Sequence, residues 1–153
     1  MLTLRPFTPE DMNIFKEWLN KAYIKDFFGE PEDWISEVME HLASLDWIHY
    51  FIVEYDGSPI GFTQYYETDK APEGDWSQEP AGTVGIDYMI GEENYLAKGL
   101  GSTIVEAMVK TIKSQGRYNH IIADPNAYNI ASIKVLEKNG FKLISNGLYK
   151  LTL

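Results

Sequence analysis

Hydrophobic and polar residues follow two kinds of pattern along the chain. Short segments in which apolar residues alternate or run together are typical of β-strands, and longer segments in which they recur every three or four positions are typical of amphipathic helices. Strands are predicted at residues 2–7, 49–55, 58–66, 83–90, 120–123, 141–144 and 148–153. Helices are predicted to begin after residue 8 and to break near residues 27–29, then to begin again at residue 31 and after residues 98–101 and 126–129.

The order of these elements predicts the fold class. The first three strands are expected to form an antiparallel meander, because Asp56-Gly57 between the second and third is a tight-turn signal. The later strands alternate with helices, which favours a mixed sheet with helices on both faces. We therefore expect a single α/β domain over residues 1–153. Its central sheet would be mixed and mostly antiparallel, flanked by about four helices.

Composition and charge narrow the function classes. The formal net charge of −10 at pH 7 disfavours nucleic acid, whose phosphates would be repelled, and favours cationic partners. Cysteine is absent, which excludes disulfides, thiolate zinc sites and cysteine nucleophiles. His41, His49 and His120 share no metal-ligand spacing, so no metal site is expected. With no basic leader and no apolar run of membrane-spanning length, we expect a soluble, cytoplasmic protein, either a monomer or a homodimer.

One stretch carries the first candidate binding site. Lys98-Gly99-Leu100-Gly101-Ser102-Thr103 ends an extended segment and opens a helix. The two glycines let the backbone approach a ligand closely, and the first amides of a helix have no partners inside it. Together with the helix dipole and Lys98, these amides predict an anion site. A tight turn into a helix would show the same residues, so this stretch alone does not assign a ligand.

Acidic residues supply the candidate chemistry. Asp87 interrupts an apolar strand, where it could attract an ammonium group and accept its proton, or could hydrogen-bond to a turn. Asp124 ends the neighbouring strand, where open sheets present ligands, or it caps the turn at Pro125. Residues 67–82 form a long polar loop that is expected to be exposed. This loop contains Glu73, Asp75 and Trp76. Their carboxylates and indole ring would suit a polycationic sugar, or they would simply be solvated.

Two spaced motifs resemble the acetyl-CoA-binding half of the GNAT superfamily of N-acetyltransferases. They are Gly99-Leu100-Gly101 and the segment that runs from Asn129 to Glu137-Lys138-Asn139-Gly140-Phe141. Within that superfamily the chain is similar to the aminoglycoside 6'-N-acetyltransferases over residues 17–20, 27–29, 59–64, 85–87, 98–101 and 124–125. The resemblance implies the GNAT fold and direct acetyl transfer from acetyl-CoA to a primary amine of an aminoglycoside-like polycation, and with it antibiotic resistance. Branches that acylate siderophore precursors, polyamines or other small amines have similar segments, and a non-catalytic acyl-CoA sensor is a further alternative.

The resemblance also implies roles for individual residues. Asp87 would be the general base, acting through a water. The pantetheine would pair with the strand that ends at Ile90, and the pyrophosphate would bind the start of the next helix; these cofactor-binding residues are Tyr88, Met89, Ile90, Lys98, Gly99, Leu100, Gly101, Ser102, Thr103 and Asn129. The acceptor would contact Phe28, Glu73, Asp75, Trp76, Asp87 and Asp124, with Gln64 and Tyr66 as weaker candidates.

The chain departs from the family pattern at two positions. Many members place Arg or Gln where this chain has Leu96, so the grip on the pyrophosphate would depend more on backbone amides and Lys98. In many members a tyrosine near the sulfur acts as general acid, and the matching residue here is Leu136. Either the thiolate leaves without an acid, as the low pKa of a thiol permits, or another hydroxyl such as that of Tyr128 or Tyr149 reaches the site.

Overall fold

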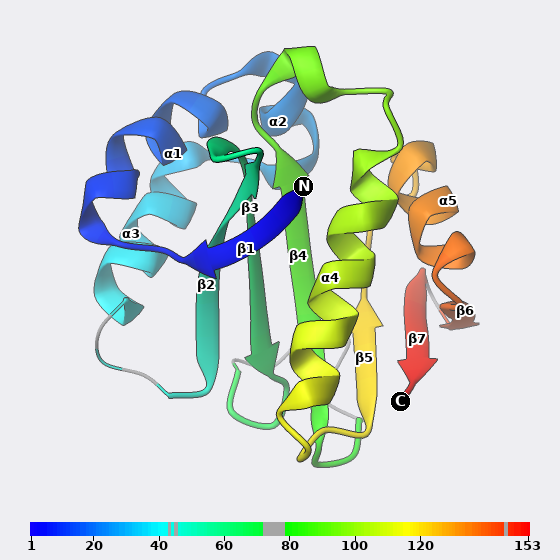
Figure 1. Cartoon of the computed structure of the whole chain (residues 1–153). Coiled ribbons are helices and arrows are strands. Elements are labelled where there is room, and N and C mark those ends of the chain that lie inside the picture. Colours follow the sequence, from blue (N-terminus) through cyan, green and yellow to red (C-terminus); the bar gives the residue numbers. More distant parts are fainter. Residues whose placement is uncertain (43, 45, 72–78, 146) are drawn as a thin grey trace.

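A seven-stranded sheet runs through the molecule in the order β1-β2-β3-β4-β5-β7-β6 (Figure 1). The computed structural model describes the whole chain except residues 43, 45, 72–78 and 146. Its strands are β1 (Leu2–Pro6), β2 (Ile48–Tyr55), β3 (Ser58–Glu67), β4 (Thr83–Ile90), β5 (His120–Ala123), β6 (Lys142–Ser145) and β7 (Leu148–Thr152). Strands β4 and β5 pair in parallel and the other neighbours pair antiparallel. The predicted mixed, mostly antiparallel sheet is confirmed.

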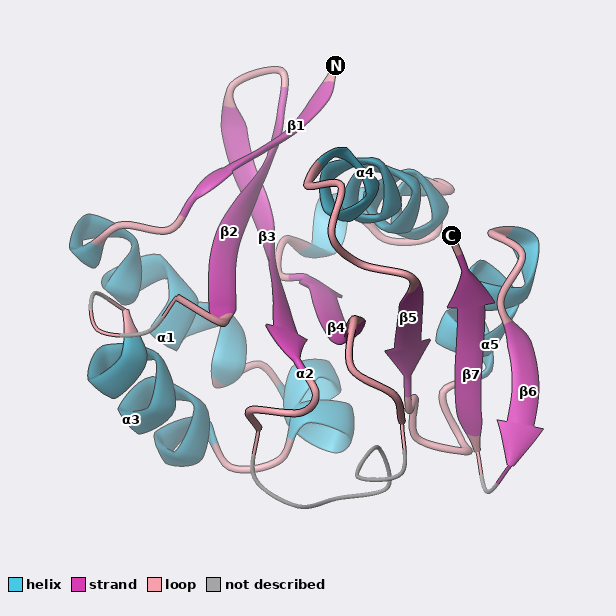
Figure 2. Ribbon diagram, turned by 90° about the horizontal axis from the view of Figure 1, so that it is seen from below, coloured by secondary structure: helices cyan, strands magenta, loops and turns pink. Residues whose placement is uncertain are grey.

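Helices cover both faces of this sheet, as predicted. They are α1 (Met12–Leu19), α2 (Ala22–Phe28), α3 (Pro31–His41), α4 (Leu100–Ser114) and α5 (Ile130–Lys138), with short 3-10 turns η1 (Pro9–Asp11) and η2 (Glu93–Tyr95). Figure 2 shows α1 and α3 on one side of the sheet and α4 on the other. No helix in the described part of the chain is long and apolar enough to cross a membrane.

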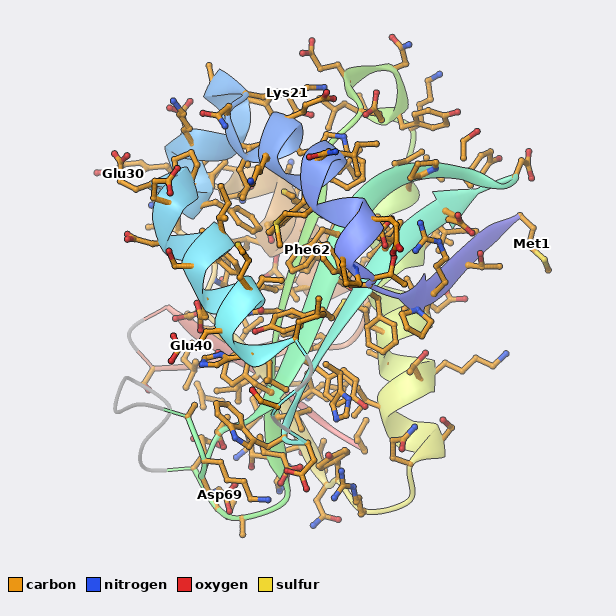
Figure 3. All side chains as sticks on the ribbon, turned by 90° about the vertical axis from the view of Figure 1, so that its left-hand side faces the viewer. Met1, Lys21, Glu30, Glu40, Phe62 and Asp69 are labelled. Carbon is orange, nitrogen blue, oxygen red and sulfur yellow. The ribbon has the colours of Figure 1, made fainter. Side chains whose placement is uncertain are left out.

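The sheet separates two hydrophobic cores. Because successive side chains of a strand point to opposite faces, β4 places Val84 and Ile86 in the core beneath α4 and Met89 in the core beneath α1 and α3. Phe62, labelled in Figure 3, is fully buried in the second core, where its ring centroid lies 4.4 Å from that of Phe15. Apolar periodicity in the sequence therefore located both layers correctly.

The predicted break near residues 27–29 is confirmed, but a second interruption, at residues 20–21, was not predicted. The first helix ends at Leu19, and Lys21 has an extended backbone with φ −70° and ψ 137° before α2 begins. The side chain of Asn20 donates a hydrogen bond to the carbonyl of Lys16, which stabilises this early end. The buried Ile24 continues the apolar periodicity through the interruption, so the pattern alone did not reveal it. Near residues 27–29 it is α2 that ends, at Gly29, whose φ is 80°.

The polar segment before β4 also begins later than expected. Glu67 is the last residue of β3, and Thr68 is buried and donates its backbone N–H to the carbonyl of Thr83. The expectation of an exposed loop from residue 67 is therefore wrong at its start, because these residues extend the sheet. At the other end of the segment, Glu79 forms an ion pair with Lys150 of β7 at 2.7 Å.

Candidate active site

The sheet opens between β4 and β5. These strands pair only where Thr83, Val84 and Gly85 face His120, Ile121 and Ile122. Strand β5 ends at Ala123, whereas β4 continues to Ile90 along β3. Residues 86–90 therefore have no strand partner on the β5 side among the described residues. This free edge can hydrogen-bond an extended ligand, as the edge of any sheet can.

Two adjacent cavities occupy the opening. The first has a volume of about 110 Å³ and is lined by Phe27, Phe28, Trp34, Ile86, Asp87, Tyr88, Ala123, Asp124, Pro125, Asn126, Asn129, Ser132 and Leu136. The second is larger, about 240 Å³, and is lined by Tyr23, Ile24, Phe27, Phe28, Tyr88, Met89, Ile90, Leu96, Gly101, Asn129, Ala131, Ser132 and Val135. We call them the acidic cavity and the apolar cavity. They share five lining residues, Phe27, Phe28, Tyr88, Asn129 and Ser132, so they meet along one boundary.

Asp87 is a carboxyl group of the acidic cavity with a defined hydrogen-bond partner. It faces Gln64 across the β3–β4 pair, and the Gln64 side-chain N–H donates to its carboxylate at 2.8 Å. Burial raises the pKa of Asp87 to about 6, and the negative charges of Asp124 and Glu37 act in the same direction. The hydrogen bond from Gln64 opposes the rise, because it favours the charged form. A carboxyl group with such a pKa is mostly ionised at neutral pH and still basic enough to accept a proton.

The N-terminus of α4 lies beside the apolar cavity. Gly99 precedes the helix with φ 77°, a left-handed conformation that glycine adopts without strain. No side chain of the described residues caps this end, so the first amides of α4 are available to an anion. Gly101 lines the cavity, and a Cβ atom there would lie 3.3 Å from Val135 on α5. The small residue thus lets α4 and α5 approach closely beside the groove.

The corner between α1 and α2 is fastened to the end of β4. Tyr23 donates its hydroxyl to the carbonyl of Ile90 at 2.9 Å, and the Lys21 ammonium donates to the carbonyl of Gly91 at 2.6 Å. Lys21, labelled in Figure 3, lies at the end of the molecule where the chain leaves β4. The indole N–H of Trp18 donates to the carboxylate of Glu92. These contacts hold α2, and with it Phe27 and Phe28, over the cavities.

The structure brings part of the predicted site together. Asp87, Asp124, Phe28, Tyr88 and Asn129 line the acidic cavity, while Met89, Ile90 and Gly101 line the apolar one. Residues 98–100, 102 and 103 flank the apolar cavity at the start of α4, without lining it. Glu73, Asp75 and Trp76 lie outside the described residues.

Several lining residues were not predicted from the sequence. They include Tyr23, Phe27, Trp34 and Ser132. Only Phe27 carried a signal, as part of an aromatic pair before a glycine. The two hydroxyls suggested as substitutes for a tyrosine at position 136 do not line either cavity. Tyr128 is 85% exposed, and Tyr149 is buried in the core opposite Ala123.

A split sheet with a free strand edge, a glycine-headed helix and two meeting cavities fit a transferase that holds an extended, anionic donor beside its acceptor. Comparison with known proteins agrees with a transferase of this kind. The family model described as the acetyltransferase (GNAT) domain matches residues 8–147. The chain belongs to the GNAT family of acetyltransferases, so it is an N-acetyltransferase whose acetyl donor is acetyl-CoA. The family and the fold class predicted from the sequence are confirmed.

Individual relatives are similar over most of the chain. The aminoglycoside N(6')-acetyltransferase type 1 of Klebsiella pneumoniae is 32% identical over 148 residues, which cover 92% of this chain and 74% of that protein. The crystal structure of the aminoglycoside acetyltransferase AAC(6')-Ib in complex with coenzyme A superposes with a TM-score of 0.90 at 27% identity, covering 99% of this chain and 95% of that one. The same enzyme in complex with coenzyme A and kanamycin has a TM-score of 0.89, also at 27% identity, with 99% and 95% coverage.

Proposed function

We propose that this enzyme acetylates a primary amine of an aminoglycoside-like polycation by direct transfer, with Asp87 as the general base. The observation that carries the proposal is the meeting of an acidic cavity with an apolar groove beside the open N-terminus of α4. The relatives that are similar over most of the chain are aminoglycoside acetyltransferases, which favours an acceptor of that class.

The donor fits the apolar side of the opening. We assign the pyrophosphate to the first amides of α4, from Leu100 to Thr103, with Lys98 nearby. The pantetheine would lie along the free edge of β4, formed by Tyr88, Met89 and Ile90, with Asn129 on the opposite wall. Leu96 adds an apolar wall and no positive charge, so the backbone supplies most of the anion binding.

The acceptor fits the acidic side. Asp87 and Asp124 lie in the same cavity with the aromatic rings of Phe28 and Trp34, and carboxylates beside apolar rings suit an aminated sugar. The net charge of −10 would draw a polycation toward the protein, more strongly at low salt.

The proposed chemistry needs positioning and one proton acceptor. A neutral amine attacks the thioester carbonyl, a C–N bond forms, and the C–S bond breaks with its electron pair leaving on sulfur. The proton lost by the nitrogen passes to the Asp87 carboxylate, directly or through a water. Holding amine and thioester together removes much of the entropic barrier, so the base and the rigid cleft supply a large part of the catalysis.

The test is release of free thiol from acetyl-CoA with a panel of acceptors. The panel should hold kanamycin-type aminoglycosides, spermidine, lysine derivatives and basic peptides. A matched pair of aminoglycosides, one with an amine and one with a hydroxyl at the 6' carbon, tests the position of transfer. Of that pair, we expect only the compound with the 6' amine to cause thiol release. Mass spectrometry should then show an acetamide at the 6' carbon of this compound.

Other outcomes would redirect the assignment. Release with spermidine or lysine derivatives, but not with aminoglycosides, would make the acceptor another small amine and overturn the aminoglycoside proposal. Binding of acetyl-CoA without release in any reaction would favour an acyl-CoA sensor.

A further inference from the structure

Two hydroxyl groups meet at the boundary between the acidic and apolar cavities. The Tyr88 hydroxyl on β4 and the Ser132 hydroxyl on α5 are hydrogen-bonded at 2.5 Å, and both residues line both cavities. Asn129 accepts a hydrogen bond from the backbone N–H of Ser132 and so caps α5 one turn before it. The serine is therefore fixed to the end of a helix, and the tyrosine is fixed to the serine.

A thioester that spans from the groove to the acceptor must place its sulfur near this boundary. Negative charge develops on the sulfur as the C–S bond breaks, and a hydrogen-bond donor aimed at such charge lowers the barrier. The wall residue Leu136 has no hydroxyl to offer, and Tyr128 and Tyr149 line neither cavity. Tyr88 and Ser132 remain as a hydroxyl pair shared by both sides of the boundary.

The pair can turn one proton toward a third atom. Two hydroxyls that share one hydrogen bond use one O–H proton between them. The Tyr88 hydroxyl also lies 3.4 Å from the backbone carbonyl of Ser132, a long hydrogen bond that a bond to a developing thiolate would replace. Burial raises the pKa of Tyr88 to about 12. A thiol titrates at about 8.5, so a tyrosine in this setting holds its proton more tightly than a thiolate would. Hydrogen bonding to the leaving sulfur is thus favoured over full proton transfer.

We propose that the Tyr88–Ser132 pair donates a hydrogen bond to the thioester sulfur and stabilises the departing thiolate. Tyr88 is then a catalytic residue through its side chain, and Ser132 positions it. In this step the C–S bond breaks, its electron pair remains on sulfur, Tyr88 keeps its proton, and the thiolate takes a proton from solvent after release. The inference rests on the proposed placement of acetyl-CoA along β4.

The experiment compares coenzyme A with desulfo-coenzyme A, which lacks the sulfur. Calorimetry at about pH 9, where an ordinary thiol is mostly ionised, gives the affinity of both compounds for the wild type and for Tyr88→Phe. We expect the wild type to prefer coenzyme A by about ten- to a hundredfold, the range of a hydrogen bond to a charged group. In Tyr88→Phe this preference should disappear while the affinity for desulfo-coenzyme A stays the same.

Kinetics supply the second readout. In Tyr88→Phe, kcat should fall by about ten- to a hundredfold with little change in the KM for acetyl-CoA, and Ser132→Ala should lose less because the tyrosine hydroxyl remains. Tyr128→Phe is the matched control, since it removes an exposed hydroxyl outside both cavities, and its kcat should equal that of the wild type.

The outcomes separate two failures. If neither compound binds the wild type, the proposed placement of acetyl-CoA is wrong. If both compounds bind and the coenzyme A preference is equal in wild type and Tyr88→Phe, only the role of the hydroxyl pair is overturned. A fall in kcat together with an equal loss of affinity for both compounds would show a structural role for Tyr88 and would likewise overturn it.

Discussion

Asp11 and Asp87 are both largely enclosed carboxyl groups, and their surroundings are opposite. Asp11 accepts hydrogen bonds from two nitrogens of the Arg5 guanidinium at 2.8 Å each and from the backbone N–H and hydroxyl of Thr8. Asp87 accepts one hydrogen bond from the neutral amide of Gln64 and has the carboxylates of Asp124 and Glu37 near it. The pKa of Asp11 is held below its usual range by Arg5, whereas that of Asp87 is raised to about 6 by burial.

The opposite pKa shifts of the two carboxyl groups indicate different roles. Asp11 ties β1 to the start of η1 and α1, so its charge is neutralised and its contribution is structural. Asp87 is in a position where ionisation is costly, so it reduces stability, and the proposed function assigns it the role of base. Each prediction below tests one side of this contrast.

The largest expected effect is on turnover. Replacing Asp87→Asn keeps the shape of the side chain and removes the base, so kcat should fall by about a hundredfold or more. The affinity for acetyl-CoA, measured by calorimetry, should be unchanged because the proposed donor site lies on the other side of the boundary. Unchanged turnover would mean that Asp87 is not the base and that the contrast with Asp11 has no functional meaning.

The opposite effect is expected at Asp11. Asp11→Ala removes the carboxylate that accepts two hydrogen bonds from the Arg5 guanidinium and one from the backbone N–H of Thr8. The loss should destabilise the protein by about 3 kcal/mol. Urea unfolding at neutral pH measures this loss, and kcat of the folded variant should match that of the wild type.

A matched control and a pH test accompany this prediction. Glu54 accepts a single hydrogen bond, at 2.9 Å, from the Nε atom of Arg5. Glu54→Gln removes the charge of this acceptor and should reduce the free energy of unfolding by less than Asp11→Ala does. The carboxyl of Asp11 has a lowered pKa when folded, so its stabilisation is present above the ordinary pKa and is lost as the pH falls through the folded value. An equal difference from the wild type at neutral and strongly acidic pH would contradict the ion-pair account.

Asp87→Asn should also raise stability, in a pH-dependent way. The folded protein holds the Asp87 proton more tightly than the unfolded chain, so its ionisation reduces stability as the pH rises from about 4 to about 6, and the penalty is constant above that. The variant should therefore be more stable than the wild type by about 3 kcal/mol near pH 8 and gain nothing near pH 4. Thermal or urea unfolding at both pH values tests this, and a pH-independent difference would contradict it.

The fold was largely predictable because its information is local. The apolar pattern located β4, the glycine turn located the start of α4, and Asp56-Gly57 marked the first hairpin, where both residues have positive φ. The interruption at residues 20–21 was missed because the apolar spacing continues through it into Ile24. A side-chain hydrogen bond from Asn20 decides that boundary, and periodicity does not contain it.

Without the family resemblance, the carboxylates of the site were predictable only where a residue broke the local pattern. Asp87 stood out as a carboxylate in an apolar strand, and Asp124 as one at a strand end. Tyr23, Trp34 and Ser132 fit ordinary helices, and their place in the cavities depends on where β5 stops and on how α2 is fastened to β4. That arrangement is tertiary, so no spacing in the chain encodes it directly.

The smallest effect is expected at Gln64, and it tests the contrast most directly. The Gln64 N–H favours the charged form of Asp87, so Gln64→Leu should raise the pKa of Asp87 further above 6. The acidic limb of kcat/KM should move to higher pH by about one unit, the size expected for one hydrogen bond to a charge, with little change near pH 8. Thr63→Val is the control, because that side chain lies on the opposite face of β3, and its limb should not move. A limb that stays in place in Gln64→Leu would show that the titrating group is not Asp87, and the raised pKa would then have no part in catalysis.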